Sequence, residues 1–249
     1  MNSQANYRFA RLELALGSQA IASLNHAFVT VIGLGGVGGS AAETLVRSGV
    51  GHVRLVDTDI CQPSDINRQI FSLSSTIGHR KVDVAEQRLL DINPALIVKT
   101  DHMFFHADTA PLLLNPKPDW VIDAIDAVLP KVELLSYCVN HRIPVISCMG
   151  AAQKQDWRQI RISAIQETSF CPLARIIRRR LGRRGIREGI TCVYSTEAIP
   201  PESKVVPESD SLVSNTRGRP RPPMGSYAPI VNMFGILAAD FVIHAIVKK

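Results

Sequence analysis

The sequence predicts an α/β protein with a Rossmann-like, doubly wound and mostly parallel sheet, which a C-terminal antiparallel part and a crossing loop extend. Three observations predict this fold. A β-branched run at residues 29–32 leads directly into a glycine-rich turn that opens a helix. Short apolar runs then alternate with amphipathic helical stretches, which is typical of a parallel sheet covered by helices. After Gly150 the pattern changes to an alternating strand and, later, a very apolar final helix.

The composition is that of a globular protein. The 249 residues are 46% hydrophobic, which is enough for a sizeable core. The five cysteines form no C-x-x-C pair, which argues against a zinc site or a disulfide framework and favours a reducing cytoplasm. The polar start does not resemble a signal peptide. Residues 228–247 are apolar but contain Asn232, Asp240 and His244, so they predict a buried core helix and no membrane partner.

The net charge of +6 comes from one local run. Seven arginines and no acidic residue lie between Arg175 and Arg187, and removing their charge from the total leaves −1 for the rest of the chain. A local basic surface is typical of a protein with a polyanionic partner. Phosphate contact is our interpretation, and a solvated run of charge is the alternative. The run contains no aromatic residue, so it gives no support for base stacking.

The glycine-rich turn predicts a nucleotide site. Gly33, Gly35 and Gly38 fill the G-x-G-x-x-G pattern. The first glycine permits a tight turn, the second lets the backbone approach a phosphate, and the third lets helix and strand pack closely. We expect the following helix, residues 40–48, to direct free backbone N–H groups at that phosphate. The turn alone does not specify the nucleotide or the chemistry.

A helical lead-in is predicted before the first strand, over residues 7–24. Gly17 can end a first helix and Ser18 can cap a second one. Arg8 and Arg11 lie on this lead-in, and on the sequence alone they are solvated charges.

The second strand, residues 52–56, ends in Asp57. This residue lies 19 positions after Gly38, about where a dinucleotide-binding fold places the carboxylate that binds a ribose hydroxyl. We favour ribose binding over a simple turn aspartate.

The polar stretch after Asp57 differs from that of a simple dinucleotide oxidoreductase. It contains Ser64, Asp65, Asn67, Arg68 and Gln69, which are residue types that can line a triphosphate, although an irregular surface loop is the alternative. Arg68 is the candidate for bidentate phosphate binding.

The next helix is predicted over residues 78–92, with Arg80 and Lys81 in its first turn. Cations there oppose the helix dipole at a cost of a few tenths to ~1 kcal/mol. A residue placed against local preference indicates function. Contact between Lys81 and an ATP phosphate would explain it, and a tolerated surface charge is the alternative.

Asp126 follows the fourth predicted strand, where open α/β sheets bind ligands. It suits the N-cap of the next helix, or it can bind magnesium or phosphate, and both interpretations stay open here. The other strands expected up to this part of the chain span residues 96–100, 120–122 and 144–148, and the helices span residues 109–114 and 129–140.

The C-terminal part is predicted to start with a half-exposed strand at residues 159–163. Cys171 and Pro172 then open the arginine-rich helix. A thiol at a helix N-terminus suggests sulfur chemistry only weakly, and an inert cysteine is the favoured interpretation. A strand at residues 190–195, a flexible crossing loop at about 198–223 and a helix from about residue 229 complete the chain.

Five motifs in order resemble those of the ubiquitin-activating-enzyme-like (ThiF/MoeB) superfamily, and the resemblance covers residues 8 to about 247. The motifs are Gly33-Leu-Gly-Gly-Val-Gly38, Asp57-Thr-Asp59, Asn67-Arg68-Gln69, Gly78-His-Arg-Lys81 and Asp123-Ala-Ile-Asp126.

Within the superfamily the chain most resembles the tRNA threonylcarbamoyladenosine dehydratase branch. The last of the five motifs, Tyr194-Ser-Thr-Glu197 and the helix after the crossing loop carry this resemblance. The missing C-x-x-C pairs remove the zinc that is usual in the sulfur-carrier adenylyltransferases. Some dehydratases also have a cysteine in the crossing loop, and this chain has none after Ser195.

The resemblance implies a single ATP-binding adenylating domain over residues 1–249. Its parts would be a lead-in at 1–27, a nucleotide-binding core at 28–150 and a tRNA-facing extension at 151–249. The implied enzyme is an ATP-dependent cyclo-ligase that dehydrates threonylcarbamoyladenosine next to the tRNA anticodon by activating its carboxylate. The alternative is an adenylyltransferase that activates the C-terminus of a ubiquitin-like sulfur carrier. A nicotinamide-dependent oxidoreductase and a non-catalytic RNA-binding scaffold are weaker rivals.

The resemblance also implies roles for individual residues. ATP and magnesium are the implied cofactors, with room for a monovalent cation but no zinc, and Asp126 is the magnesium candidate. Arg11 would reach into the partner subunit's site, which implies a homodimer, and a sulfur-relay partner of a cysteine desulfurase system is compatible with the branch. The implied catalytic residues are Arg68, Lys81, Asp126 and Arg11; the nucleotide-binding residues are Gly33, Gly35, Gly36, Gly38, Asp57, Asp59, Asn67, Arg68 and Lys81; the tRNA-binding residues are Arg175, Arg178, Arg179, Arg180, Arg183 and Arg184.

Overall fold

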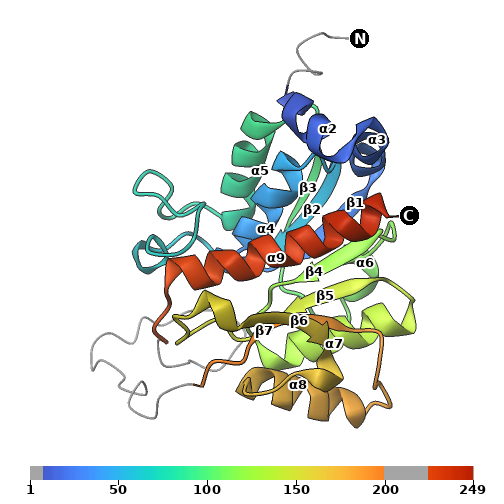
Figure 1. The fold of residues 1–249 in the computed structure, drawn as a ribbon. Helices are drawn as coiled ribbons and strands as arrows, with labels where there is room; N and C mark the ends of the chain where they lie inside the picture. Colours follow the sequence, from blue (N-terminus) through green and yellow to red (C-terminus); the bar gives the residue numbers. More distant parts are fainter. Residues whose placement is uncertain (1–7, 199–223, 249) are drawn as a thin grey trace.

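The computed structural model describes residues 8–198 and 224–248, so most of the predicted crossing loop lies outside the described residues. The described chain forms a seven-stranded sheet in the order β3-β2-β1-β4-β5-β7-β6 (Figure 1). All neighbouring strands are parallel except β6 and β7, which confirms the predicted fold class. The strands are β1 Phe28–Ile32, β2 His52–Asp57, β3 Ile97–His102, β4 Trp120–Asp123, β5 Val145–Cys148, β6 Ile160–Ala164 and β7 Thr191–Ser195.

Helices cover both faces of the sheet (Figure 1). One apolar core lies among β1, α4, α5 and α9, and a second lies among β4, α6, α7 and α8. The helices are α2 Ala10–Leu16, α3 Ser18–His26, α4 Gly36–Arg47, α5 Lys81–Ile92, α6 Ala110–Leu113, α7 Val128–Asn140, α8 Pro172–Gly182 and α9 Ala228–Val247, with short 3₁₀ turns η1 Pro63–Asp65, η2 Trp157–Gln159 and η3 Ile165–Glu167.

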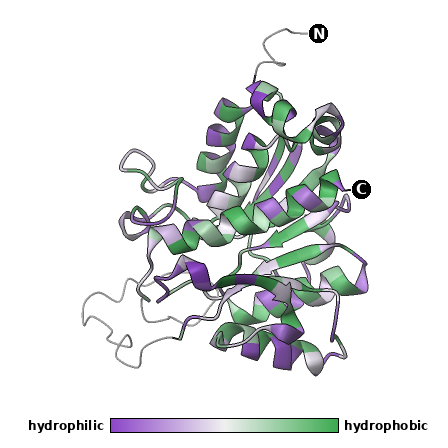
Figure 2. Ribbon diagram, in the orientation of Figure 1, coloured by the Kyte–Doolittle hydropathy of each residue, from purple (hydrophilic) through white to green (hydrophobic). Residues whose placement is uncertain are grey.

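The helix α9 is a packed part of the core. By length and composition it is the one described helix that could span a membrane, and half of its most apolar window is buried inside the protein. Figure 2 shows it as a largely hydrophobic helix that crosses in front of the sheet. It packs on α4 so closely that a Cβ on Gly235 would lie 2.1 Å from the carbonyl oxygen of Val37. This agrees with the predicted buried core helix.

The strand order reverses between β1 and β4. β1 pairs with β2 on one side and with β4 on the other, so the connections leave these strands in opposite directions. In open α/β sheets, ligands bind at such a switch point, outside the carboxyl ends of the strands. The loops that follow β1, β2 and β4 therefore form the candidate site.

Several element boundaries differ from the predictions. The helix α4 begins at Gly36 and not at residue 40, because the glycines belong to its first turns. The helix α5 begins at Lys81 and not at residue 78, because Arg80 pairs with Ile60 in an isolated β-bridge. Gly17, and not Ser18, is the N-cap of α3.

Of the two interpretations left open for Asp126, the N-cap of the next helix is not the one that the structure shows. The N-cap of α7 is Ala127, and no side chain caps this helix. The ligand-binding role of Asp126 stays a prediction.

Candidate nucleotide site

The glycine turn is shaped by close backbone packing. Gly33 has φ +90°, and a Cβ there would lie 2.8 Å from the carbonyl oxygen of Ala124 in the loop after β4. A Cβ on Gly36 would lie 2.5 Å from Val231 Cγ1 of α9 and 2.8 Å from the carbonyl oxygen of Arg68. The protein's own packing therefore explains the glycines at these two positions.

Gly35 has no such explanation. Its φ of −66° is open to any residue. The nearest atom to a Cβ at this position is Gln69 Nε2, at 4.0 Å. The space beside Gly35 is thus left open at the N-terminus of α4, where backbone N–H groups and the helix dipole favour an anion.

Asp57 ends β2 beside the glycine turn. Its Oδ2 accepts a hydrogen bond from Leu34 N at 2.5 Å, and its Oδ1 accepts one from Asp59 N at 2.7 Å. Burial raises the pKa of this carboxyl against the opposing effect of Lys81. Each carboxylate oxygen keeps a further lone pair, so Asp57 can still accept ribose hydroxyls.

Lys81 lies among three carboxylates. Its Nζ is 3.2 Å from Asp59 Oδ2 and 3.8 Å from Asp65 Oδ2, and its side chain is 6% exposed. Burial alone would lower the pKa of Lys81, but Asp57, Asp59 and Asp65 together outweigh it and raise the pKa. The site therefore holds a permanent buried cation at neutral pH.

Asp65 joins the polar loop into one unit. Its Oδ1 accepts hydrogen bonds from Gln69 Nε2 at 2.7 Å and from Arg68 Nη2 at 3.1 Å, and its Oδ2 accepts one from Gln62 N. Arg68 also donates to the Ser64 carbonyl oxygen. The sequence prediction included Asp65 in the polar stretch but not among the site residues. The sequence could have indicated this role of Asp65, because the residue precedes Arg68 by three positions and the two side chains can meet within one helical turn.

Gln69 leaves one polar atom without a partner in the described structure. Its side chain is buried, and its Oε1 has no hydrogen bond. An unsatisfied buried acceptor costs about 1–3 kcal/mol. The nitrogen of the same amide is the atom that faces Gly35, and it already donates to Asp65. The features that fit the phosphates of a nucleotide are the cations Lys81 and Arg68 and the open N-terminus of α4 at Gly35.

A second polar cluster beneath the site was missed from the sequence. Asp123 Oδ2 accepts hydrogen bonds from Lys131 Nζ at 2.7 Å and from Ser147 Oγ at 2.6 Å, and all three side chains are fully buried. Asp123 Oδ1 also accepts a hydrogen bond from Ile125 N. The cluster therefore holds the turn that leads to Asp126, whose side chain is exposed. Lys131 appeared in the sequence as an ordinary helical residue.

Asn67 connects the polar loop to the chain that enters α9. Its Nδ2 donates to the Ser226 carbonyl oxygen, and its Oδ1 accepts from Arg68 Nη1.

Within the described ranges, no three His, Cys, Asp or Glu side chains are grouped to hold a metal ion. Magnesium is commonly bound by one or two carboxylates and by the phosphates of a substrate. The magnesium role of Asp126 therefore stays a prediction.

The cysteine thiols near the sheet are unreactive by environment. All five cysteines are buried. Burial raises the pKa of Cys148 to about 12, and burial also raises the pKa of Cys138 and Cys192. These three thiols stay protonated at neutral pH and are poor nucleophiles.

The arginine-rich helix α8 does not present all its arginines alike. Arg178 donates from Nη1 to the carbonyl oxygen and Oγ1 of Thr168 and to the carbonyl oxygen of Ile165. It thereby ties α8 to η3, unlike the free phosphate contact that was expected. The arginines on α8 and just after it that are exposed are Arg175, Arg179, Arg180, Arg183 and Arg184.

Arg11 lies far from the site of its own chain. It is exposed on α2, and the neighbouring Leu12 approaches Gly49, which precedes β2 at the amino end of the sheet. Figure 1 shows α2 and the loops after β2 at opposite ends of the sheet. Arg11 therefore lies too far from the glycine turn of its own chain to contact it.

The comparisons with known proteins agree with this geometry. A tRNA threonylcarbamoyladenosine dehydratase of Bacillus subtilis is 36% identical over 97% of this chain and 95% of its own length. The structure of the E. coli tRNA N6-threonylcarbamoyladenosine dehydratase TcdA in complex with ATP superposes with a TM-score of 0.87, at 30% identity, covering 100% of this chain and 97% of that one. The E. coli molybdopterin-synthase adenylyltransferase is 31% identical over 72% of this chain and 68% of its own length. The model of the ThiF family matches residues 8–249, and the chain belongs to the ThiF family.

Proposed function

We propose that this protein is an ATP-dependent tRNA threonylcarbamoyladenosine dehydratase. It would use ATP to activate the carboxylate of the modified adenosine next to the anticodon, and it would close that side chain into a ring with loss of one water. The observation that carries the proposal is the open N-terminus of α4 at Gly35, which Asp57 joins through Leu34 to the segment that carries Arg68 and Lys81. The near full-length similarity to the Bacillus subtilis dehydratase supports the choice of substrate.

Different site residues would bind different parts of the nucleotide. Asp57 accepts the ribose hydroxyls, and the turn from Gly33 to Gly38 approaches the phosphates with its backbone. Lys81 and Arg68 neutralise the triphosphate, which otherwise repels the substrate carboxylate. To reach a phosphate, Arg68 exchanges its hydrogen bonds to Ser64 and Asn67 for charge-assisted ones.

The chemistry needs positioning and charge more than a protein nucleophile. The substrate carboxylate attacks the α-phosphorus and forms an acyl-adenylate, and the cations stabilise the charge that develops there. The neighbouring carbamoyl group then attacks the activated carbonyl and loses a proton, so that a five-membered ring closes and AMP leaves with the oxygen that is lost. Proximity makes this ring closure favourable. The protonated, buried thiols at the sheet agree with a reaction that needs no cysteine.

Magnesium and Asp126 belong to the same proposal. Asp126 lies on the turn that Asp123 and Lys131 hold, at the carboxyl end of β4. A carboxylate there suits a magnesium ion that enters with the triphosphate, or it positions the α-phosphate directly. A magnesium ion would supply charge neutralisation for the phosphates.

The tRNA and a second subunit complete the proposed assembly. The exposed arginines of α8 would contact the tRNA backbone and position it without reading its sequence. Arg11 lies at the wrong end of its own chain to reach the site, which supports a homodimer in which it enters the partner's site. Cytoplasmic tRNA is the natural substrate pool for a chain with five free cysteines.

An adenylyltransferase for a ubiquitin-like sulfur carrier is the second candidate function. The similarity to the E. coli molybdopterin-synthase adenylyltransferase favours it, but that match covers less of both chains than the match to the dehydratase. It also leaves the exposed arginines of α8 without a role. A sulfur-relay partner of a cysteine desulfurase system would fit either function.

The purified protein tests the proposal when it is incubated with ATP, magnesium and tRNA that carries threonylcarbamoyladenosine. Nucleoside mass spectrometry should show loss of one water from that nucleoside alone, and only with ATP. An unchanged nucleoside, with ATP consumed in the presence of a carrier-protein tail, would favour the second function.

A further inference from the structure

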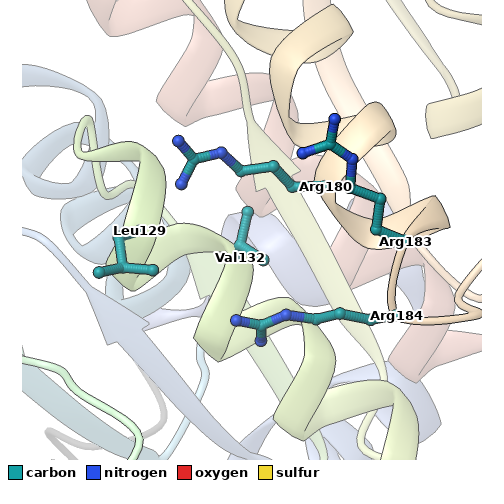
Figure 3. A pocket seen from close by; sticks show the side chains of 5 residues that line it. All are labelled: Leu129, Val132, Arg180, Arg183 and Arg184. Atoms are coloured by element: carbon teal, nitrogen blue, oxygen red, sulfur yellow. The ribbon is translucent and has the colours of Figure 1, made fainter.

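A groove runs between α7 and α8 on the face of the sheet opposite to α9. Its volume is about 240 Å³, and it is lined by Leu129 and Val132 of α7 and by three arginines. Figure 3 shows the side chains of Arg180 and Arg184 extending toward α7 on either side of Val132, with Arg183 beside Arg180. The groove therefore has an apolar floor and cationic walls.

The charge of this groove is not neutralised by the described part of the chain. None of the arginines that line it forms an ion pair with a described carboxylate. Arg184 is held in place from α7, because its Nη1 donates to Ser136 Oγ at 3.1 Å. Three guanidinium groups in this arrangement offer planar, bidentate donors, which match the oxygens of a phosphate.

The floor of the groove favours a ligand with an uncharged face as well as an anion. Leu129 is 48% exposed, and it lies beside the cations rather than in the core. A sugar ring can cover such a side chain while its phosphate meets the arginines. The volume is below the roughly 300–1,000 Å³ of a pocket that encloses a whole small ligand, so it suits one unit of a longer chain.

The groove begins beside the proposed reaction site. The helix α7 starts at Val128, two residues after Asp126, and Leu129 belongs to its first turn. A strand that places its reacting nucleoside near Asp126 would therefore meet the groove within a short distance along its backbone.

We infer that the groove between α7 and α8 binds one phosphodiester linkage of the substrate RNA next to the reacting nucleoside, with its sugar on Leu129. Arg180 and Arg183 contact the phosphate, and Arg184 closes the other side. The groove sets the register of the RNA strand, in contrast to the scattered contacts that Arg175 and Arg179 make with more distant phosphates. This inference rests on the proposed function, because it takes tRNA as the substrate.

A methylphosphonate scan tests the inference. The probe is an anticodon stem–loop RNA that carries threonylcarbamoyladenosine, with one loop linkage at a time made neutral. With the wild-type protein, a linkage next to the modified adenosine should lose roughly tenfold in affinity, because a charge-assisted contact is removed. With Arg180→Ala/Arg183→Ala, the same neutral linkage should change affinity by less than about twofold, because the two changes remove one interaction.

The control is a variant that also loses two positive charges, but from positions outside the groove. Lys99 on β3 and Lys248 after α9 are exposed, and Lys99→Ala/Lys248→Ala should retain the full penalty at the sensitive linkage. Melting temperatures close to that of the wild type are expected for both double variants, since none of the four side chains is buried.

The outcomes separate the inference from the proposed function. Equal penalties in the wild type and in Arg180→Ala/Arg183→Ala would overturn the groove as the phosphate site. Unchanged RNA affinity in that variant would overturn it too, and would point to an acidic protein partner for the groove. A wild-type protein that neither binds the RNA nor dehydrates it would instead defeat the proposed function.

Discussion

Gly38 and Gly33 touch across the turn that joins β1 to α4. A Cβ on Gly38 would lie only 1.7 Å from the Gly33 carbonyl oxygen and 2.8 Å from its carbonyl carbon. The contact presses the first turns of α4 against the end of β1. It leaves the N-terminus of the helix, rather than a side chain, facing the candidate phosphate position.

This contact predicts opposite results for two glycine substitutions. Gly38→Ala should destabilise the fold by more than about 3 kcal/mol, because backbone atoms cannot yield to the methyl group. Gly35→Ala should change the free energy of unfolding by less than about 1 kcal/mol, since its Cβ position is open and its φ is ordinary. Urea unfolding measures both. Gly35→Ala should nevertheless bind ATP at least tenfold more weakly by calorimetry, and unchanged affinity would mean that no phosphate approaches this position.

Asp57→Asn should separate ATP binding from stability. Burial raises the pKa of Asp57 in the folded state, so its ionised form opposes folding at neutral pH. The variant should lose ATP affinity while stability falls by no more than about 1–3 kcal/mol, because the amide accepts only one of the two backbone hydrogen bonds and the relief of the buried charge offsets part of that loss. The ribose role predicts that the wild type prefers ATP to 2′-deoxy-ATP and that Asp57→Asn does not. A preference that survives the substitution would assign the ribose to another residue.

Lys81→Met should lower turnover by about 10²-fold, because it removes a buried cation from the triphosphate site. It should destabilise the fold by about 1–3 kcal/mol, since Asp57 loses the cation that opposes the effect of its burial and Asp65 keeps only Arg68 as a charged partner.

The pH dependence of this loss follows from the raised pKa of Lys81. The stabilisation is fully present below the unfolded value of about 10.4 and is lost as pH rises through the higher folded value. Unfolding curves of the two proteins should therefore differ equally at pH 7 and pH 9 and converge above about pH 10.4. A difference that already shrinks between pH 7 and pH 9 would contradict a raised pKa.

Arg178→Ala and Arg179→Ala should affect different properties, although the residues are adjacent. Arg178 shares three backbone and hydroxyl acceptors in and after η3, so its loss should cost about 1–3 kcal/mol of stability. Arg179 is exposed, and its loss should change stability by less than about 0.5 kcal/mol. The salt dependence of tRNA binding should flatten by about one unit of slope for Arg179→Ala and stay unchanged for Arg178→Ala. The reverse pattern would remove the distinction between the two side chains.

The sequence predicted most of the architecture because the fold follows from local pattern. The β-branched runs, the glycine turn and the spacing from Gly38 to Asp57 each have a local physical cause. The predicted ends of the elements were wrong where packing between distant segments determines where an element begins. The close approach of Gly38 to Gly33 was predicted from the glycine pattern, whereas the packing of Gly36 against Val231 of α9 is one that no local pattern reveals.

The site was predictable in its charges but not in its supporting contacts. Arg68 and Lys81 were predicted as site residues because they are charged residues at unfavourable or polar positions. The roles of Asp65 and Lys131 depend on partners that only the fold brings together, at Gln62 and at Asp123 and Ser147. The sequence also could not distinguish the structural Arg178 from the exposed arginines of α8, because the acceptors of Arg178 lie on η3 and on the residue after it.

The central claim is that ATP activates the carboxylate of the modified adenosine. The most direct measurement uses tRNA whose threonylcarbamoyl carboxylate carries ¹⁸O, with mass spectrometry of the nucleoside and of the nucleotide products. Our account predicts that the nucleoside loses one water only when ATP is present and that one labelled oxygen appears in the phosphate of AMP. Label found only in water, or a nucleoside that stays unchanged while ATP is bound, would contradict it.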